Sequence, residues 1–303
     1  MRFVPAALLL SVAAWLPQPS PAQCAGEVAL QVLGSGGPIA DDARASSGYL
    51  LWLDGHARLL VDTGGGVFLR FGEAGAQFED LDAIVLTHLH TDHAADLPAL
   101  LKSAYFSERQ RPLPIFGPSG APRWPRTSEF IDGLFGSERG VFRYLDGFLD
   151  GSDGFRIEPH DMDADSREPV TLLDNGRFRV QAVGVHHGPV PALGLLIEAH
   201  GKRIALSGDQ NDDNPAFARL AQGAGLLIMD HAIPQDAGPV ARALHATPRH
   251  IGAMAAQAGI KHLVLSHLMA RSLNRLERNK QLIRESYRGP LSVAEDLACY
   301  TPD

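Results

Sequence analysis

Cysteine, basic charge and long apolar runs are all scarce in this sequence of 303 residues. There are 27 Lys and Arg against 35 Asp and Glu, so the formal net charge is −8 and no basic footprint is present to attract nucleic acid. The two cysteines, Cys24 and Cys299, lack the spacing of metal ligands. They could pair in an oxidising compartment or remain two separate thiols. No internal repeat is evident, and the length suffices for one sizeable core or two modest ones.

The apolar run that does exist lies at the N-terminus. Arg2 precedes an apolar stretch over residues 4–16, and small residues at positions 20 and 22 suit cleavage after Ala22. That stretch is too short to span a membrane comfortably, and no later one approaches its length. We expect residues 1–22 to be a signal peptide and residues 23–303 to form the mature domain. A periplasmic or secreted protein without a stable membrane anchor is then expected, with a retained anchor as the alternative.

Residues 84–93 carry an unusual density of metal-binding side chains. An apolar, β-favouring run, residues 84–86, leads into four ligand-type residues within six positions: His88, His90, Asp92 and His93. Residues two apart in an extended segment project to the same side, so His88 and His90 can bind one ion together. Asp92 and His93 are adjacent and must diverge, which suits a second ion beside the first. This mixture of imidazole and carboxylate is typical of zinc and similar divalent metals.

Metal-capable side chains also follow other predicted strands. Six apolar strands end at or just before such residues: Val61 before Asp62, Leu86 before His88 and His90, Val185 before His186 and His187, Leu206 before Asp209, Met229 before Asp230 and His231, and Leu265 before His267. The carboxyl ends of strands are where layered α/β folds bind ligands. A polar residue that ends a strand explains any one of these positions, but six together indicate a shared site.

Helices are predicted where proline or a capping residue precedes an apolar pattern. We expect Asp96 to cap one helix, Thr247 to cap another that begins at Pro248, and residues 271–288 to form a single basic, amphipathic helix. Residues 107–178 are rich in proline and weakly patterned. We interpret them as the middle of the same domain, with loops that shape a pocket.

The ligand-type residues resemble, as an ordered set, the motifs of the metallo-β-lactamase fold. The set consists of His88-x-His90-x-Asp92-His93, a later histidine, the aspartate of a Ser-Gly-Asp sequence and a final histidine after a strand. Within that family the chain looks most like the branch that holds ribonuclease Z and the periplasmic arylsulfatases. The supporting segments are residues 33–38, 61–64, 187–194 and 245–248. The resemblance implies an α/β fold, a four-layer αββα sandwich.

The resemblance also implies two Zn²⁺ per chain, although other divalent metals could replace zinc. The ligands it implies are His88, His90 and His187 for one ion, Asp92, His93 and His267 for the other, and Asp209 as a bridge between them. His186 is the alternative to His187, but the Gly-Pro-Val-Pro-Ala-Leu-Gly run that follows favours His187. Asp62 resembles the buried aspartate that braces the histidine loop in this family.

Asp230 and His245 match a pair in which a carboxylate orients a histidine near the leaving group. A histidine held in this way can donate a proton, so we assign catalysis to Asp92, His245 and Asp230. Two ions held about 3.5–4 Å apart lower the pKa of a bridging water, which supplies the attacking hydroxide. The role of His231 is left open.

The sequence indicates the substrate less clearly than it indicates the fold or the metal ligands. The signal peptide and the run from His187 to Gly194 favour an arylsulfatase-like hydrolase of a small-molecule ester, with no nucleic-acid partner. Ribonuclease Z itself fits poorly, because the chain is acidic and has no Gly-rich, basic arm. A lactonase or phosphodiesterase on the same metals is the alternative, and a non-catalytic, metal-binding periplasmic module is a remote one. A homodimer is left open.

Overall fold

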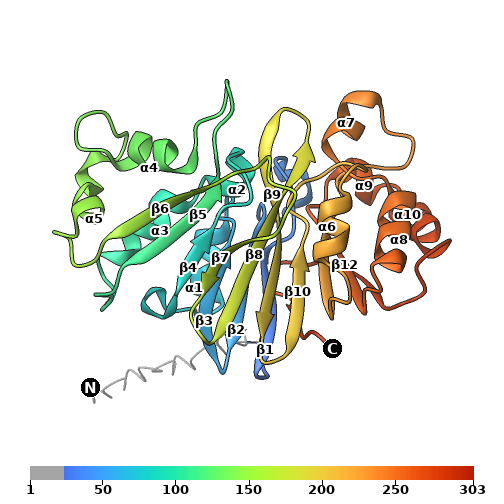
Figure 1. The fold of residues 1–303 in the computed structure, drawn as a ribbon, viewed down its shortest axis with the longest axis horizontal. Helices are drawn as coiled ribbons and strands as arrows, with labels where there is room; N and C mark the ends of the chain where they lie inside the picture. The colour runs from blue at the N-terminus through green and yellow to red at the C-terminus, as the bar shows by residue number, and fades with distance from the viewer. Residues whose placement is uncertain (1–23) are drawn as a thin grey trace, which may run out of the picture.

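Two β-sheets packed face to face form the centre of the protein in a computed structural model, which describes residues 24–303 (Figure 1). In the described chain the first sheet has the order β14-β1-β2-β3-β4-β5-β6, with strands β14 (Cys299–Tyr300), β1 (Val28–Gly34), β2 (Gly48–Leu53), β3 (His56–Val61), β4 (Ala83–Val85), β5 (Leu113–Pro118) and β6 (Ile157–Met162). The expected signal peptide, residues 1–22, lies outside the described residues.

The second sheet has the order β13-β12-β11-β10-β9-β8-β7 within the same described range. Its strands are β13 (Leu291–Val293), β12 (His262–Ser266), β11 (Leu226–Asp230), β10 (Lys202–Leu206), β9 (Val190–Ala199), β8 (Phe178–His187) and β7 (Val170–Asp174). Residues 107–178 thus contribute β5 and β6 to one sheet and β7 to the other.

Helices cover the outer faces of both sheets (Figure 1). The helices of the first half are α1 (Val67–Glu73), α2 (Thr91–Ala94), α3 (Leu97–Ala104), α4 (Thr127–Phe135) and α5 (Gly147–Asp150), with short 3₁₀ turns at Ala40–Asp42, Phe78–Asp80 and Arg143–Leu145. Those of the second half are α6 (Pro215–Leu220), α7 (Pro239–Leu244), α8 (Pro248–Gln257), α9 (Ala270–Leu273) and α10 (Leu276–Arg284). The predicted four-layer αββα sandwich is confirmed.

The alternation of side chains along each strand explains these layers. In β1, Leu30 and Val32 enter the apolar layer between the sheets, whereas Ala29 and Leu33 enter the layer under the helices. Successive residues of a strand point to opposite faces, so a strand covered on both sides must be apolar throughout. Every residue of β1 is buried, in keeping with that requirement.

Strand direction gathers the ends of six strands at one edge of the sandwich. Strands β3, β4, β5 and β6 run parallel to one another, as do β10, β11, β12 and β13. Strand β8 is antiparallel to β9, which is antiparallel to β10, so β8 also ends at the edge where β10 ends. The residues that follow these strands therefore converge, as the sequence predicted.

Two capping predictions were wrong in detail. The Asp96 carboxylate accepts hydrogen bonds from the backbone N–H groups of Gly66 and Phe68, at 2.8 and 2.9 Å, so it caps α1 and not the helix that it precedes. Thr247 donates its hydroxyl proton to Asp212 at 2.9 Å and makes no side-chain cap. In both cases a tertiary partner replaces the local one that the sequence pattern suggested.

The predicted single helix over residues 271–288 is two helices, α9 and α10. The break lies at residues 274–275, where the chain turns so that α10 packs against α8. The side chain of Asn279, buried in α10, donates to the carbonyl oxygen of Ser272 in α9 at 3.3 Å. The amphipathic pattern continues across residues 274–275, so the sequence did not indicate the break between the two helices.

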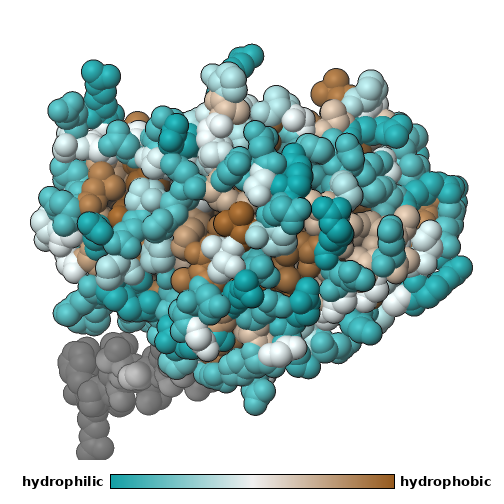
Figure 2. Space-filling model, in the orientation of Figure 1, coloured by the Kyte–Doolittle hydropathy of each residue, from teal (hydrophilic) through white to brown (hydrophobic). Residues whose placement is uncertain are grey.

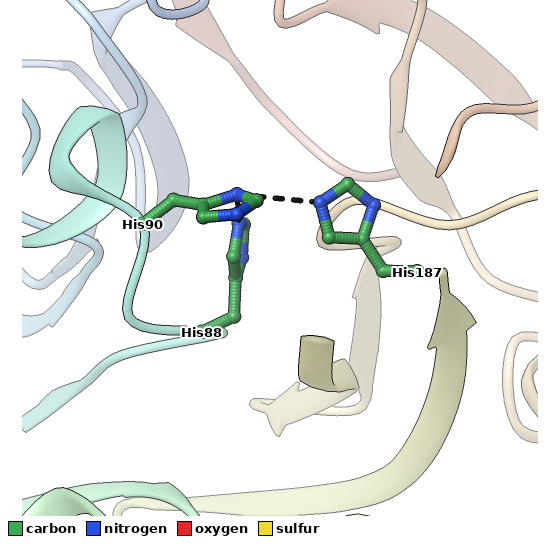
Figure 3. Close-up of side chains that lie close together, drawn as sticks. All are labelled: His88, His90 and His187. Carbon is green, nitrogen blue, oxygen red and sulfur yellow. Dashed lines mark hydrogen bonds between the residues drawn. The ribbon is translucent and has the colours of Figure 1, made fainter. Parts of the chain in front are cut away.

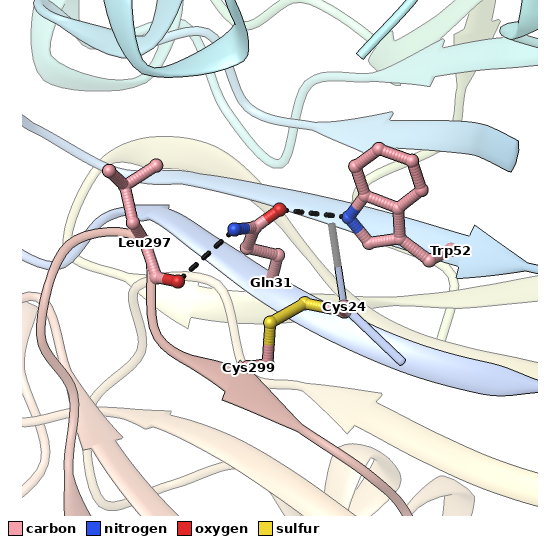
Figure 4. The surroundings of a disulfide bond; sticks show 5 residues. All are labelled: Cys24, Gln31, Trp52, Leu297 and Cys299. Carbon is pink, nitrogen blue, oxygen red and sulfur yellow. Dashed lines mark hydrogen bonds between the residues drawn. A yellow bond between two sulfur atoms is a disulfide. The ribbon is translucent and has the colours of Figure 1, made fainter. Parts of the chain in front are cut away.

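A disulfide joins Cys24 to Cys299, the pairing that the sequence left open (Figure 4). It links the start of the described chain to β14 at the edge of the first sheet. Beside it, the Gln31 amide donates to the carbonyl oxygen of Leu297 at 3.1 Å and accepts from the indole N–H of Trp52 at 2.9 Å. The C-terminal segment is therefore held to the first sheet by covalent and hydrogen bonds together.

The surface is largely hydrophilic on the face shown in Figure 2, with small apolar areas between polar side chains. The most exposed large apolar side chains among residues 24–303 are Phe106 at 84%, Val240 at 79% and Val141 at 74%. Within residues 24–303, no helix has the length and apolar character needed to cross a membrane.

Candidate metal centre

The histidine segment after β4 is held by a buried carboxylate. Asp62, at the end of β3, accepts from the backbone N–H of Thr87 at 2.7 Å, from the Thr87 hydroxyl at 2.8 Å and from Nδ1 of His93 at 2.8 Å. A Cβ on Gly64 would lie 2.1 Å from the carbonyl oxygen of Asp92, so only glycine allows this close approach. The segment is thereby fixed before any ligand binds.

Three histidines have ring nitrogens that point toward one another (Figure 3). Nδ1 of His90 lies 3.0 Å from Nε2 of His88 and 3.4 Å from Nε2 of His187. His88 and His90 belong to the segment after β4, and His187 ends β8. Three nitrogens directed at one point form a typical site for a borderline-soft cation.

The tautomers of these rings follow from their outer hydrogen bonds. His187 donates its Nδ1–H to the carbonyl oxygen of Leu244 at 2.8 Å, which leaves the Nε2 lone pair facing the cluster. The hydroxyl proton of Thr87 goes to Asp62, so His88 must donate its own Nδ1–H to Thr87 Oγ1, at 3.2 Å. Outer partners of this kind orient histidine ligands in metal sites.

A second group of three forms beside the first. Nε2 of His267 lies 3.2 Å from Asp92 Oδ2, and Nε2 of His93 lies 3.6 Å from the same oxygen. His267, directly after β12, has a positive φ of 53°, and Asp62 has one of 61°. Positive φ is uncommon for residues other than glycine, and such strained residues concentrate at functional sites.

Asp209 lies between the two groups. Its Oδ2 atom is 3.2 Å from Nε2 of His267 and 3.8 Å from Nε2 of His187, and its Oδ1 atom is 3.6 Å from Nε2 of His93. One carboxylate thus reaches histidines of both groups. We call His88, His90, Asp92, His93, His187, Asp209 and His267 the ligand cluster.

The electrostatics of the ligand cluster favour a bound cation. Burial would lower the pKa of His93, but the carboxylates of Asp209 and Asp62 outweigh it and raise that pKa well above its ordinary range. Nε2 of His93 is buried and has no hydrogen-bond partner in the described chain. The buried carboxylates of Asp209 and Asp62 therefore stabilise positive charge at His93, whose Nε2 atom has no partner among the described residues.

All the remaining ligands except His267 are in the protonation state that metals bind. Burial would lower the pKa of His267, but the carboxylates of Asp209 and Asp92 outweigh burial and raise that pKa. Burial lowers the pKa of His90 and of His187 to about 4, so both rings are neutral near pH 7. Burial would raise the pKa of Asp92, but its hydrogen bond with His267 and the charge of His93 lower it to about 2. Neutral imidazoles in one group, and two imidazoles in the other whose raised pKa values reflect the buried carboxylates, fit a dinuclear centre of divalent metal ions.

His245 and Asp230 form a hydrogen-bonded pair beside the ligand cluster. Nδ1 of His245 lies 2.8 Å from Asp230 Oδ2 and 3.8 Å from Asp209 Oδ2. Burial and the charge of Asp209 raise the pKa of Asp230 well above its ordinary range, and burial lowers the pKa of His245 to about 4. His245 also lies close enough to His187 and Asp209 to be considered as a metal ligand.

The two other histidines that the sequence left open lie outside the ligand cluster. His186 turns away, and its Nδ1–H donates to the carbonyl oxygen of Asp213 at 2.6 Å. His231 is fully buried, and its Nε2 accepts from the amide of Asn279 at 3.2 Å. The structure therefore brings His187, and neither of these residues, into the cluster.

Four segments surround the ligand cluster, and we call them the rim. They are residues 119–126 between β5 and α4, the β8–β9 turn at residues 188–189, helix α7, and Arg271. The loop before α4, the start of β9 and α7 all lie at one end of the sandwich (Figure 1). Gly188 N–H donates to the carbonyl oxygen of Ala243 at 3.0 Å, which joins two of these segments.

Two rim residues near the cluster were not singled out by the sequence reasoning. The ring of Trp124 lies 5.2 Å from the ring of His90, centroid to centroid. The exposed Arg271 donates from Nε to the carbonyl oxygen of Ala232 at 2.8 Å, and its charge contributes to the lowered pKa of His245. For Trp124 a signal existed in the sequence, a tryptophan between Arg123 and Arg126.

Comparison with known proteins agrees with the geometry. A family model described as a beta-lactamase superfamily domain matches residues 57–268. Ribonuclease Z of Mycolicibacterium gilvum is 32% identical over 261 residues, which cover 79% of this chain and 84% of that protein.

Two solved structures show the same fold. One is the metallo-beta-lactamase fold protein YhfI from Bacillus subtilis, with a TM-score of 0.67 at 23% identity, covering 90% of this chain and 99% of that one. The other is the short form of human tRNase Z, with a TM-score of 0.68 at 21% identity, covering 91% of this chain and 99% of that one.

These relatives correct two expectations. The expected arylsulfatase-like enzyme, acting on a small-molecule ester and without a nucleic-acid partner, was wrong, because the relatives are named ribonuclease Z. The expectation rested on the N-terminal stretch and on the run from His187 to Gly194, and ribonuclease Z was set aside because of the net charge of −8. That charge averages over the whole chain and does not describe the rim. Exposed arginines lie there at positions 123, 126, 242 and 271.

Proposed function

The chain belongs to the β-lactamase superfamily, in its ribonuclease Z-like branch, and on that premise we propose that this metal-dependent hydrolase cleaves phosphodiester bonds in RNA. The observation that carries the proposal is the 2.8 Å hydrogen bond between His245 and Asp230 beside the ligand cluster. A histidine held by a buried carboxylate can protonate the oxygen that leaves when a phosphodiester bond breaks. Relatives named ribonuclease Z support RNA as the polymer.

We assign the ligand cluster to two zinc ions. One would be held by His88, His90 and His187, and the other by Asp92, His93 and His267, with Asp209 shared. The mixture of imidazole and carboxylate suits zinc, and buried second partners such as Asp62 and the Leu244 carbonyl orient the rings. When bound, two such ions supply Lewis acidity toward phosphoryl oxygens and an activated water.

The remaining chemistry comes from the side chains. Burial and the charge of Asp209 raise the pKa of Asp230, so Asp230 keeps its proton and donates it from Oδ2 to Nδ1 of His245. The neutral ring of His245 then carries its own hydrogen on Nε2. Nε2 makes no hydrogen bond to any residue from 24 to 303, where the hydrogen bond of the ring is made by Nδ1, and is therefore available to a leaving oxygen. Asp230 is a positioning residue, since it acts on substrate through His245.

Arg271 supplies positive charge at the opening of the site. Its Nε–H is committed to the Ala232 carbonyl, which fixes the plane of the guanidinium, while the terminal nitrogens make no hydrogen bond within the described residues. A fixed guanidinium suits the oxygens of a phosphodiester. We therefore include Arg271 among the residues that position RNA.

We also propose that residues 1–22 direct export and that the mature domain works outside the cytoplasm. The apolar N-terminal stretch supports this, and so does the Cys24–Cys299 disulfide, because disulfides persist in oxidising compartments. The substrate would then be RNA met outside the cytoplasm, and a tRNA precursor is one structured example to test.

A substrate panel tests the proposal. Protein loaded with two zinc ions per chain is given a labelled tRNA precursor, an unstructured RNA of equal length and an aryl sulfate. We expect cleavage of at least one RNA and no release of sulfate. If both RNAs stay intact while the metal content is two per chain, the proposed function is wrong.

A further inference from the structure

Trp124 stands at the open side of the ligand cluster. Its ring lies 5.2 Å from that of His90 at an interplanar angle of 68°, and the side chain is partly exposed. His90 is also partly exposed, whereas His88, His93, His187 and His267 are buried. The indole therefore lies next to the most accessible histidine of the cluster.

A short hairpin holds the indole in place. Ala121 and Trp124 exchange two backbone hydrogen bonds, at 3.0 and 2.9 Å, around the two-residue tip Pro122-Arg123. Trp124 borders an apolar gap, too small for a water molecule, together with Leu89, Pro118, Pro125, Val190 and Pro191. An aromatic ring on a narrow, proline-flanked hairpin loses little conformational freedom when a ligand contacts it.

We propose that Trp124 is a stacking platform for the nucleobase next to the scissile phosphate. The inference rests on the proposed RNA substrate and adds the residue that recognises the base. A phosphate bound over His90 would place its neighbouring nucleoside within reach of a ring 5 Å away. Base–aromatic stacking tolerates any sequence, because every base has a π-face.

Arg123 completes the contact. It occupies the tip of the hairpin, is exposed, and makes no ion pair within residues 24–303, whereas Arg126 is paired with Glu129 at 3.4 Å. A cation beside a stacking ring is the combination that single-stranded nucleic-acid sites use to follow the backbone. We assign the next phosphate along the strand to Arg123.

A purely structural role for Trp124 predicts a different outcome. If the indole only holds the His90 ring, its removal should lower metal content and should slow cleavage equally with or without a base beside the scissile phosphate. If it stacks on a base, metal content should be unchanged and the loss should depend on that base.

The test is a double-mutant cycle between protein and RNA. Native protein, Trp124→Ala and Trp124→Phe are assayed on an oligoribonucleotide and on versions that are abasic on the 5′ or the 3′ side of the cleavage point. Trp124→Ala should lower kcat/KM on the intact RNA by roughly tenfold to a hundredfold, and Trp124→Phe by less. On one abasic RNA, the same Ala substitution should cost less than about threefold, since the partner base is already gone.

Phe106→Ala is the matched control, because Phe106 is 84% exposed and lies after α3, outside the rim. Equal losses on intact and abasic RNA, or a loss of metal from Trp124→Ala, would overturn the inference. If native protein cleaves no RNA, the proposed function fails instead, and fluorescence then tests Trp124 separately.

The described chain has one other tryptophan, Trp52, which is only 1% exposed. A 2′-O-methyl RNA hexamer added to metal-stripped protein should therefore quench emission in native protein and not in Trp124→Phe. Equal quenching in both proteins, or none in native protein, would overturn the inference.

Discussion

The ligand cluster and the rim are built in opposite ways. Each histidine of the cluster follows or ends a buried strand, and partners such as Asp62 and the Leu244 carbonyl fix the rings from behind. The rim consists of a hairpin, a turn and short helices with exposed arginines. The difference teaches that the fold itself sets the metal chemistry, whereas the choice of substrate belongs to segments that can change without disturbing the sheets.

Removing the bridging carboxylate should have the largest effect, because Asp209 contacts histidines of both metal groups. Asp209→Asn keeps the shape and removes the charge, so we expect metal content below two per chain and a loss of activity of at least about 10³-fold. Metal analysis by mass spectrometry and RNA cleavage rates measure both. Asp213→Asn, four residues further on and exposed, should change neither. Normal metal content in Asp209→Asn would contradict the assignment.

His245 lies between the ligand cluster and the rim, and its substitution distinguishes a proton donor from a metal ligand. His245→Gln should lower kcat by about 10²- to 10⁴-fold with both metal ions retained, because a proton donor is lost. Asp230→Asn should have a smaller effect in the same direction. Loss of metal from His245→Gln would instead make His245 a ligand.

Acid should destabilise the folded protein through His231, a histidine that is buried outside the rim. Burial lowers the pKa of His231 from 6.5 to about 4. His231 therefore binds a proton more tightly in the unfolded chain than in the folded one. The free energy of unfolding should be unaffected by His231 above pH 6.5 and should decrease as the pH falls from 6.5 toward 4. The loss should reach at most about 3 kcal/mol.

Urea unfolding of metal-free native protein and His231→Gln, at several pH values, measures this loss. The difference in the free energy of unfolding between the two proteins should change over that pH range. His250→Gln, a partly exposed histidine in α8, should run parallel to native protein. A parallel curve for His231→Gln would contradict the prediction.

The smallest expected effect belongs to the rim. Arg271→Ala should lower kcat/KM for RNA by roughly tenfold, since one charge-assisted hydrogen bond to substrate is lost, without change in metal content. Arg275→Ala serves as the control, because Arg275 is exposed and faces Asp236 at 3.6 Å. An equal loss in the two variants would mean that only general charge matters.

The two regions also differ in what the sequence could predict. His88, His90, Asp92 and His93 lie within six positions, so local spacing alone predicted four of the seven residues of the cluster. His187, Asp209 and His267 were predictable because each follows or ends an apolar strand whose direction the fold repeats. The sequence did not predict roles that depend on tertiary partners. Asp96, for example, was expected to cap the helix that follows it, but it caps α1.

The residues of the rim could not be predicted from the sequence in the same way. Trp124 lies in a proline-rich loop without a periodic pattern, and Arg271 lies in α9, where the amphipathic pattern predicted a helix but not its position beside the ligand cluster. The substrate was misjudged for a related reason, since a net charge of −8 does not report a few arginines placed around one opening. Local charge there depends on folding, which composition does not describe.

The account is tested most directly by RNA cleavage as metal is restored to stripped protein. Labelled RNA is incubated with protein that carries zero, one or two zinc ions per chain, alongside Asp209→Asn. We predict no cleavage without metal, a maximum at two ions per chain, and no recovery in the variant. Full cleavage by stripped protein, or intact RNA at two ions per chain, would contradict the account.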